Sequence, residues 1–151
     1  MRENVHGTAL LIGTVGILIR GPAQSGKTSL CISLLRRAGS ISLNAYLVAD
    51  DRVDLETRDA GIIMTAPEAI KGLMEISGIG ILREETVETA PLSLIVDLVT
   101  AENRTRMPEK RDQRETVLGR SVRRIELPKQ DAAFSADVVL TLLRSAYLGE
   151  G

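Results

Sequence analysis

The chain has 151 residues, of which 44% are hydrophobic and 26% are charged, and its formal net charge at pH 7 is −1. This length and composition predict one folded domain with an ordinary core and exclude a chain that is disordered throughout. The near-neutral charge and the aromatic content of 2% argue against a nucleic-acid-binding protein, which would need basic side chains for phosphates and aromatic ones for bases.

The amino-terminal residues 1–7 lack the basic and then apolar pattern of a signal peptide, and no apolar run is long enough to span a bilayer. We therefore expect a cytoplasmic protein that does not bind membranes. Cys31 is the only cysteine, so no internal disulfide can form. Its position within a predicted helix favours a small core residue over a nucleophile.

Two short apolar segments, residues 8–12 and 15–19, lie near the start of the chain. A Gly-Thr pair joins them, and glycine tolerates the positive φ of a tight turn, so we expect a β-hairpin. Leucines at helical spacing then predict a helix over residues 29–37, which Gly39 is expected to end.

A phosphate-binding loop motif, G-x-x-x-x-G-K-[ST], lies between this hairpin and the helix. Its residues are Gly21, Pro22, Ala23, Gln24, Ser25, Gly26, Lys27 and Thr28. The glycines allow successive backbone amides to point at phosphate oxygens, and the helix that follows adds its positive N-terminal end. Lys27 is then expected to reach the outer phosphates and the Thr28 hydroxyl to hold Mg²⁺. The motif predicts binding of a nucleoside triphosphate; the alternative is a Gly-rich turn that happens to contain a lysine.

The acidic pair Asp50 and Asp51 follows an apolar segment, residues 43–49, which reads as a strand. Ligands bind at the carboxyl ends of strands in open α/β sheets, so the pair is a candidate partner for the loop. One carboxylate could hold Mg²⁺, and the other could take a proton from an incoming hydroxyl. The alternative is an acidic pair that only shapes a turn.

Period-two alternation over residues 53–57 and an apolar return at 62–64 predict a second hairpin. Pro67 suits the first turn of a short helix or turn near residues 70–73. The glycine-punctuated residues 76–82 then predict an extended segment.

Residues 92–99 predict another core strand, and residues 116–127 predict a late hairpin bent at a glycine. Ser135 is expected to cap a last helix whose apolar positions run to Ala146. Hairpins are more frequent than in a plain alternating βα chain, so we expect an α/β fold with a mixed sheet.

Between these strands, residues 102–115 crowd charges of both signs and predict an exposed loop. Four arginines of this loop could bind phosphate, or they could simply form a solvated face. They are Arg104, Arg106, Arg111 and Arg114.

Four segments taken together, in this order, resemble the C-terminal catalytic domain of bacterial HPr kinase/phosphorylase. They are His6-Gly7, the loop at residues 21–28, Leu47 to Val53 and Met74 to Ile81. Enzymes of this family phosphorylate a serine of the phosphocarrier protein HPr and can remove that phosphate. The chain is similar to the short, single-domain versions of alphaproteobacteria, so we expect residues 1–151 to be one catalytic domain without the N-terminal domain of many members.

The resemblance implies ATP and Mg²⁺ as cofactors and HPr, or an HPr-like protein of the phosphotransferase system, as partner. It implies that Asp50 is the base that deprotonates the target serine and that His6 hydrogen-bonds this aspartate. Thr28, Asp51 and Glu75 would then be associated with the metal. It also implies a P-loop fold with flanking helices and a mixed sheet related to phosphoenolpyruvate carboxykinase.

The chain departs from the family pattern at Ser77, where an arginine is usual, and over residues 128–134, which lack a P-G-R-N-like segment. The first change removes a cation expected near the transferred phosphate. The second leaves HPr recognition and a homo-oligomeric assembly open. The alternatives are a nucleotide-binding regulator that has lost efficient catalysis and a small-molecule kinase.

Overall fold

Six strands form the central sheet of the computed structural model, which describes residues 1–145. They are β2 (Thr8–Ile12), β3 (Val15–Arg20), β4 (Ala45–Ala49), β10 (Leu94–Val99), β11 (Arg114–Val117) and β12 (Arg120–Pro128). Their order is β11-β12-β10-β3-β2-β4, with β10 parallel to β3 and β12, and β2 antiparallel to β3 and β4. The carboxyl ends of β3, β4, β10 and β12 therefore share one edge of the sheet.

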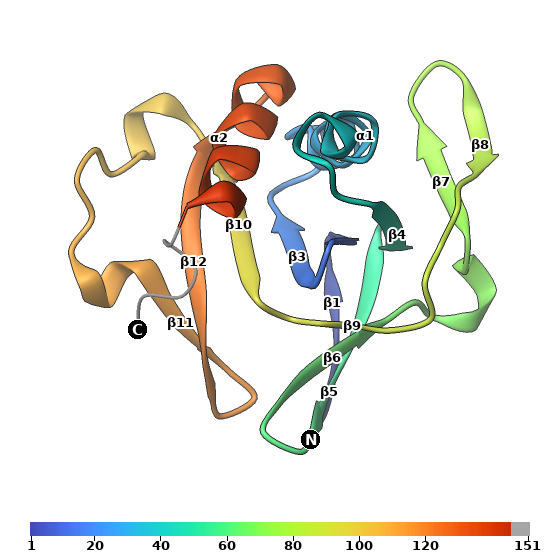
Figure 1. Cartoon of the computed structure of the whole chain (residues 1–151), viewed down its shortest axis with the longest axis horizontal. Coiled ribbons are helices and arrows are strands. Elements are labelled where there is room, and N and C mark those ends of the chain that lie inside the picture. Colours follow the sequence, from blue (N-terminus) through green and yellow to red (C-terminus); the bar gives the residue numbers. More distant parts are fainter. Residues whose placement is uncertain (146–151) are drawn as a thin grey trace.

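A second sheet of four antiparallel strands packs on one face of the first (Figure 1). Its strands, in spatial order, are β1 (Arg2–His6), β5 (Arg52–Arg58), β6 (Gly61–Thr65) and β9 (Ala90–Pro91). The remaining strands, β7 (Leu73–Ile76) and β8 (Gly80–Arg83), form a separate hairpin at the β4 side of the molecule.

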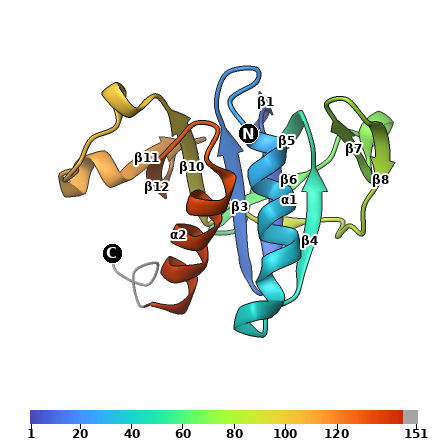
Figure 2. The ribbon, with the colours of Figure 1, turned by 90° about the horizontal axis from the view of Figure 1, so that it is seen from above.

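Two helices, α1 (Lys27–Arg37) and α2 (Ala132–Arg144), lie side by side on the other face of the central sheet (Figure 2). Short 3₁₀ helices form at Ala38–Ile41, Glu68–Ile70, Ala101–Asn103 and Lys110–Gln113. Within residues 1–145 no helix is long and apolar enough to cross a membrane.

Strand alternation explains why the central sheet has two apolar cores. In β3, Ile17 and Ile19 face the helices and pack with Leu30 and Leu34 of α1. Leu18, between them, belongs to the core on the other face, toward the second sheet. Because both faces are buried, the central strands are apolar at almost every position, and each fully buried aliphatic side chain contributes about 1.5–3 kcal/mol.

The chain at the end of β9 lies very close to the central sheet at Gly16. A Cβ atom at this position would lie 1.7 Å from the carbonyl oxygen of Pro91, and the Gly16 carbonyl accepts a hydrogen bond of 2.9 Å from the Ser93 amide. Only glycine leaves room for this crossing of the chain.

The structure confirms the α/β class, the mixed sheet, and the three predicted hairpins. It also confirms Cys31 as a core residue, because the side chain is fully buried and burial raises the pKa of its thiol well above the ordinary value. Residues 102–109 of the predicted loop are exposed, as expected, whereas the end of the loop forms the 3₁₀ helix Lys110–Gln113 and the first two residues of β11.

The predicted helix ends need correction. The first helix ends at Arg37 as predicted but begins at Lys27, and Gly39 does not terminate it, because a 3₁₀ turn at Ala38–Ile41 follows and Ser42 takes the left-handed φ of 61°. The last helix begins three residues before Ser135, which lies buried inside it while its amide donates to the Asp131 carbonyl at 3.0 Å. The apolar period starts only at Val138 and so conceals the first turn. Ala146, the last predicted helical position, lies outside the described residues.

The extended segment predicted over residues 76–82 is also wrong in part. The chain reverses at Gly78, whose φ is 82°, so that Ile76 and Gly80 become partners in the β7–β8 hairpin. The glycines provide a turn where the sequence pattern predicts a continuous extended segment.

Candidate active site

The loop between β3 and α1 is tightly curled. Gln24 and Gly26 have positive φ angles of 64° and 99°, and the Ser25 amide donates to the Pro22 carbonyl at 3.1 Å. A Cβ atom at Gly21 would lie only 2.5 Å from the Ser25 hydroxyl oxygen. The two glycines of the motif are therefore required by the curl, which is the shape that turns backbone amides toward an anion.

Helix α1 begins directly after Gly26, whose carbonyl accepts the first helical hydrogen bond from Leu30 at 2.9 Å. The amides of the preceding positions have no acceptor within the helix, and no acidic residue lies in its first turn. The Lys27 ammonium donates to the carbonyls of Gly21 and Pro22 at 2.7 and 3.0 Å. The loop thus combines unpaired amides, the positive end of a helix and a lysine above it, and these features fit a phosphate chain.

Gln130, between β12 and α2, is hydrogen-bonded to the loop. Its amide donates to the Ser25 carbonyl at 3.1 Å, and its side-chain amide donates to the Gln24 carbonyl. A Cβ atom at Gly26 would lie 3.4 Å from the Gln130 nitrogen. Sequence reasoning missed this residue, and its only local signal is its place after the strand-ending Pro128.

Asp50 lies beside the loop and is 6% exposed. One carboxylate oxygen accepts hydrogen bonds from the hydroxyls of Thr8 and Thr28, at 3.0 and 3.1 Å, and the other accepts from the Glu75 amide at 3.2 Å. These donors satisfy a buried acid that would otherwise be costly to keep in the core. The predicted approach of Asp50 to the loop residue Thr28 is present in the structure.

The other candidate residues are arranged differently from the expectation. His6 Nδ1 lies 3.9 Å from a carboxylate oxygen of Asp51, and both side chains are mostly exposed. The expected His6–Asp50 hydrogen bond does not form, because Thr8, Thr28 and the Glu75 amide are the donors to Asp50. Asp51 has a φ of 74°, and its side chain points to solvent, whereas the Asp50 side chain is buried. Glu75 contacts Asp50 through its backbone, while its side chain is exposed.

Among residues 1–145, no group of three or more His, Cys, Asp or Glu side chains could hold a metal ion by itself. Mg²⁺ in nucleotide sites is held by one or two protein oxygens together with phosphates and water. The Thr28 hydroxyl, adjacent to a buried carboxylate and at the start of α1, fits that smaller requirement.

An ion network surrounds Arg20, the residue directly before the phosphate loop. Arg20, the last residue of β3, donates to Asp97 at 2.7 and 2.8 Å and to Glu115 at 2.7 Å through two nitrogens. Arg124 also donates to Asp97. Burial alone would raise the pKa of Asp97, but hydrogen bonds and charge from the two arginines lower it below its ordinary value. The Arg20 hydrogen bonds likewise lower the pKa of Glu115.

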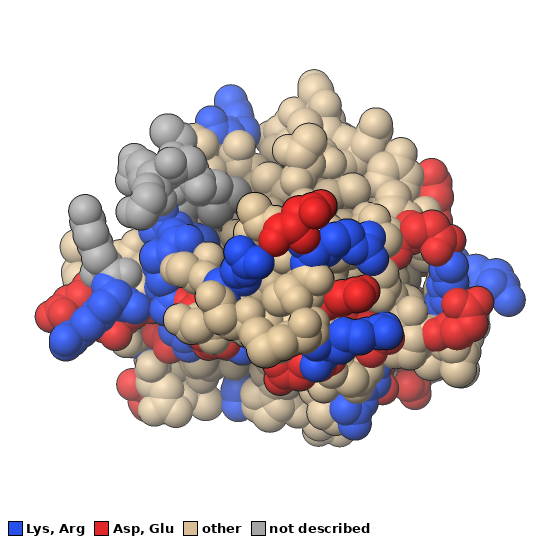
Figure 3. All heavy atoms as spheres, turned by 90° about the horizontal axis from the view of Figure 1, so that it is seen from below, with Lys and Arg blue, Asp and Glu red and all other residues tan. Residues whose placement is uncertain are grey.

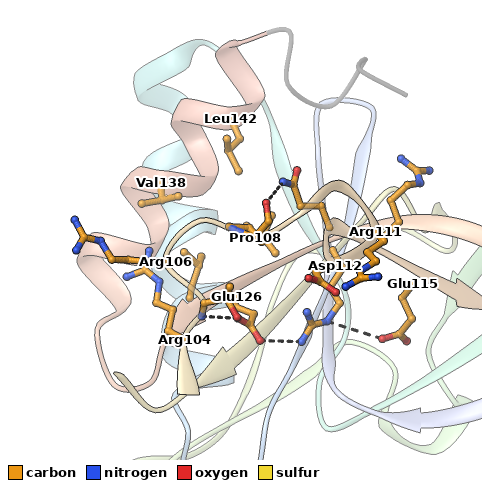
Figure 4. A pocket seen from close by; sticks show the side chains of 15 residues that line it. Arg104, Arg106, Pro108, Arg111, Asp112, Glu115, Glu126, Val138 and Leu142 are labelled. Carbon is orange, nitrogen blue, oxygen red and sulfur yellow. Dashed lines mark hydrogen bonds and ion pairs between the residues drawn. The ribbon is translucent and has the colours of Figure 1, made fainter. Parts of the chain in front are cut away.

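A cavity of about 580 Å³ lies between loop 102–115, strands β11 and β12, and α2 (Figure 4). Val138 and Leu142 contribute apolar side chains from α2, and Glu115 and Glu126 lie across the cavity from them, each paired with Arg124. None of its lining residues belongs to the loop at 21–28 or to the acidic pair. This cavity is therefore separate from the phosphate-binding loop.

The β7–β8 hairpin next to Asp50 is apolar and exposed. Ile79, Ile81 and Leu82 are 72%, 66% and 48% exposed, whereas Met74 is buried and anchors the hairpin. Elsewhere, as on the face in Figure 3, acidic and basic side chains are interspersed. The surface of this hairpin is therefore apolar, in contrast to the charged face in Figure 3.

The mixed sheet, the curled loop at a helix N-terminus and the buried carboxylate beside it define an α/β protein of the P-loop class. Residues 1–149 match the family model described as HPr Serine kinase C-terminal domain, and the chain belongs to this family. The match extends well beyond the four segments that carry the resemblance.

Named relatives and a solved structure agree with this assignment. The HPr kinase/phosphorylase of Limosilactobacillus reuteri (strain DSM 20016) is 38% identical over 107 residues, which are 66% of this chain and 32% of that protein. The enzyme of the same name from Bordetella pertussis is 33% identical over 133 residues, 82% of this chain and 41% of that protein. This chain thus spans well under half the length of these relatives.

The solved structure of the Hpr(Ser) kinase/phosphatase from Coxiella burnetii superimposes with a TM-score of 0.81 and 27% identity, covering 97% of this chain and 92% of that one. The expected P-loop fold with a mixed sheet of the phosphoenolpyruvate carboxykinase type is thereby confirmed.

Proposed function

We propose that this chain is a single catalytic domain of an ATP-dependent protein serine kinase that acts on HPr, or on an HPr-like carrier of the phosphotransferase system, in the cytoplasm. Family membership and the names of the relatives support the reaction. The observation that carries the proposal for this chain is the Thr28–Asp50 hydrogen bond of 3.1 Å, which joins the phosphate loop to a buried carboxylate.

The residues of the site suit phosphoryl transfer. The loop amides and Lys27 would hold the phosphates of ATP, with Lys27 exchanging its two carbonyl partners for phosphate oxygens. Thr28 would hold Mg²⁺, and Asp51 and Glu75 would act on it through its water ligands; the ion neutralises phosphate charge when it is bound. These assignments keep the transferred phosphate between the loop and Asp50.

Asp50 would accept the proton of the serine hydroxyl while the serine oxygen bonds to the γ-phosphorus and ADP leaves. In the reverse direction the protonated carboxyl group would return a proton to the serine oxygen as inorganic phosphate attacks phosphoserine, yielding pyrophosphate. His6 lies beside Asp51 and would act on the site through that residue.

The direct test incubates the purified chain with Mg-ATP and HPr and measures the mass of HPr. We expect a gain of one phosphate, and we expect Lys27→Ala to weaken ATP binding by about 10–100-fold, because it removes charge-assisted hydrogen bonds to the phosphates. ATP binding without any mass gain on HPr would favour the alternative, a nucleotide-binding regulator whose catalysis is weakened at Ser77.

We further expect the protein substrate to contact the β7–β8 hairpin. Ile81 pairs with Glu75, whose amide bonds to Asp50, so an HPr serine that reaches Asp50 would bring its flanking surface onto Ile81. Ile81→Ser should raise KM for HPr by about tenfold and leave kcat at saturating HPr unchanged, since apolar contact is lost in binding alone. Met107→Ser, which changes another exposed apolar residue far along the chain, is the matched control. An equal loss of kcat and kcat/KM in Ile81→Ser would contradict this contact.

A further inference from the structure

Phe134 is the only phenylalanine of the chain, and it lies 43% exposed in the first turn of α2. The guanidinium of Arg104 lies over its ring, 5.7 Å from the centroid, which is a cation–π arrangement. The Phe134 ring is thus only partly buried by the protein core, and the Arg104 guanidinium covers one of its faces. The pair therefore presents a flat, cationic surface toward solvent.

A hollow of about 280 Å³ adjoins this pair and is lined by Ala101, Arg104, Arg106 and Pro128. Its volume is close to the lower limit for small-ligand sites, about 300 Å³, and so suits one ring system. Arg106 has no hydrogen-bond or ion-pair partner within the part of the chain that the structure describes. Figure 4 shows the side chains of Arg104 and Arg106 beside α2.

The hollow lies at the same sheet edge as the phosphate loop. Pro128 pairs with Val99 at the carboxyl ends of β12 and β10, and the backbone amide of Lys129 donates to the Val99 carbonyl at 2.9 Å. Gln130, two residues after Pro128 and therefore at most about 7 Å along the chain, is hydrogen-bonded to the loop.

The strand order decides which part of a nucleotide can reach the hollow. Asp50 follows β4, on one side of β3, whereas Ala101 follows β10 and Pro128 ends β12, on the other side of β3 (Figure 2). A triphosphate whose terminal group faces Asp50 can extend its nucleoside end in the opposite direction, over β10 and β12. The hollow lies in that direction.

We propose that this hollow binds the base of the nucleotide, an inference that rests on the nucleotide binding proposed above. The planar Arg104 guanidinium stacks on the base, and the Phe134 ring holds the guanidinium flat from the other side. Arg106 places a second cation at the rim. Phe134 is thus a positioning residue, and Arg104 is the residue that touches the ligand.

Comparison of ATP with inorganic triphosphate, by calorimetry on the whole chain, isolates the base from the phosphates. We expect the unaltered protein to bind ATP more tightly than triphosphate. Arg104→Ala should weaken ATP binding about tenfold and leave triphosphate binding unchanged, because stacking on the base is lost while the phosphate loop is intact. Arg104→Lys should behave like Arg104→Ala, since it keeps the charge and loses the plane. Met107→Ala, in the same loop and 86% exposed, should change neither affinity.

The positioning role of Phe134 is tested by rescue. Phe134→Leu should weaken ATP binding several-fold, whereas Phe134→Trp should retain it, because tryptophan provides the best face for a cation. The chain has no tryptophan of its own, so the fluorescence of Phe134→Trp also reports the site directly. We expect this fluorescence to change on addition of ATP and not on addition of triphosphate.

Equal affinity of the unaltered protein for ATP and triphosphate would overturn the base site while leaving the proposed phosphate chemistry in place. An equal weakening of both ligands by Arg104→Ala would overturn it too, because Arg104 would then be a phosphate ligand. If the unaltered protein binds neither ligand, the proposed nucleotide function fails first and the base site with it.

Discussion

Replacement of Asp50 by asparagine is expected to reduce the rate of phosphate transfer to HPr by about 10²–10⁴-fold, the usual contribution of a positioned general base. Asparagine has nearly the same shape and can still accept the hydroxyl hydrogen bonds of Thr8 and Thr28 through its carbonyl oxygen. It cannot take the serine proton. ATP affinity should change only a few-fold, because Lys27 and the loop amides are untouched.

The same substitution has a structural cost that must be measured separately. The Glu75 amide donates to the second carboxylate oxygen of Asp50. In Asp50→Asn the side-chain NH₂ group would take the place of that oxygen, so two hydrogen-bond donors would face each other without an acceptor. Thermal unfolding with and without ATP therefore accompanies the rate measurement. Asp54→Asn is the matched control, since Asp54 accepts an exposed hydrogen bond from Asn4, away from Asp50 and the loop, and should keep the parental rate. Transfer at the parental rate by folded Asp50→Asn would show that another group is the base.

The parts of the site that the sequence predicts are those fixed by neighbouring residues or by a general rule of sheet topology. The spacing of Gly21, Gly26 and Lys27 is a property of eight consecutive residues, and the loop shape follows from it. The approach of Asp50 to Thr28 could be predicted because strands that run parallel end at one edge, whatever separates them in the chain.

The parts that were missed depend on packing between distant segments. Gln130 holds Gln24 across 106 residues, and nothing near either residue indicates this contact. His6 pairs with Asp51 instead of Asp50 because consecutive residues at the end of β4 point in opposite directions and the buried one already has three donors. Likewise, the proposed base site depends on the arrangement of β10, β12 and α2, so the sequence indicates the arginines of loop 102–115 only as possible phosphate ligands or as a solvated face.

The ion network around Arg20 leads to a prediction on the free energy of unfolding. Asp97→Asn should lower the free energy of unfolding by about 2–4 kcal/mol at pH 7, because Arg20 and Arg124 lose a charged partner in a site where Asp97 is only 14% exposed. The matched control is Asp137→Asn, which breaks the Arg37–Asp137 pair, where the side chains are 42% and 68% exposed. That surface pair should contribute less than about 1 kcal/mol.

The pH dependence of the difference identifies the charge as its cause. The pKa values of Asp97 and Glu115 are lowered in the folded protein, so the stability that they contribute is fully present above their unfolded values, about 4, and is lost as pH falls through the lowered folded values. The difference in unfolding free energy between the parent and Asp97→Asn should therefore be constant from pH 7 to about pH 5 and shrink below about pH 4, where the parental carboxylate is protonated and resembles the amide. Urea unfolding at a series of pH values measures this difference. A difference that persists unchanged into strong acid would mean that shape, and not charge, makes Asp97 important, and the support of the phosphate loop would then have to come from Glu115 and the packing of β3 against β10.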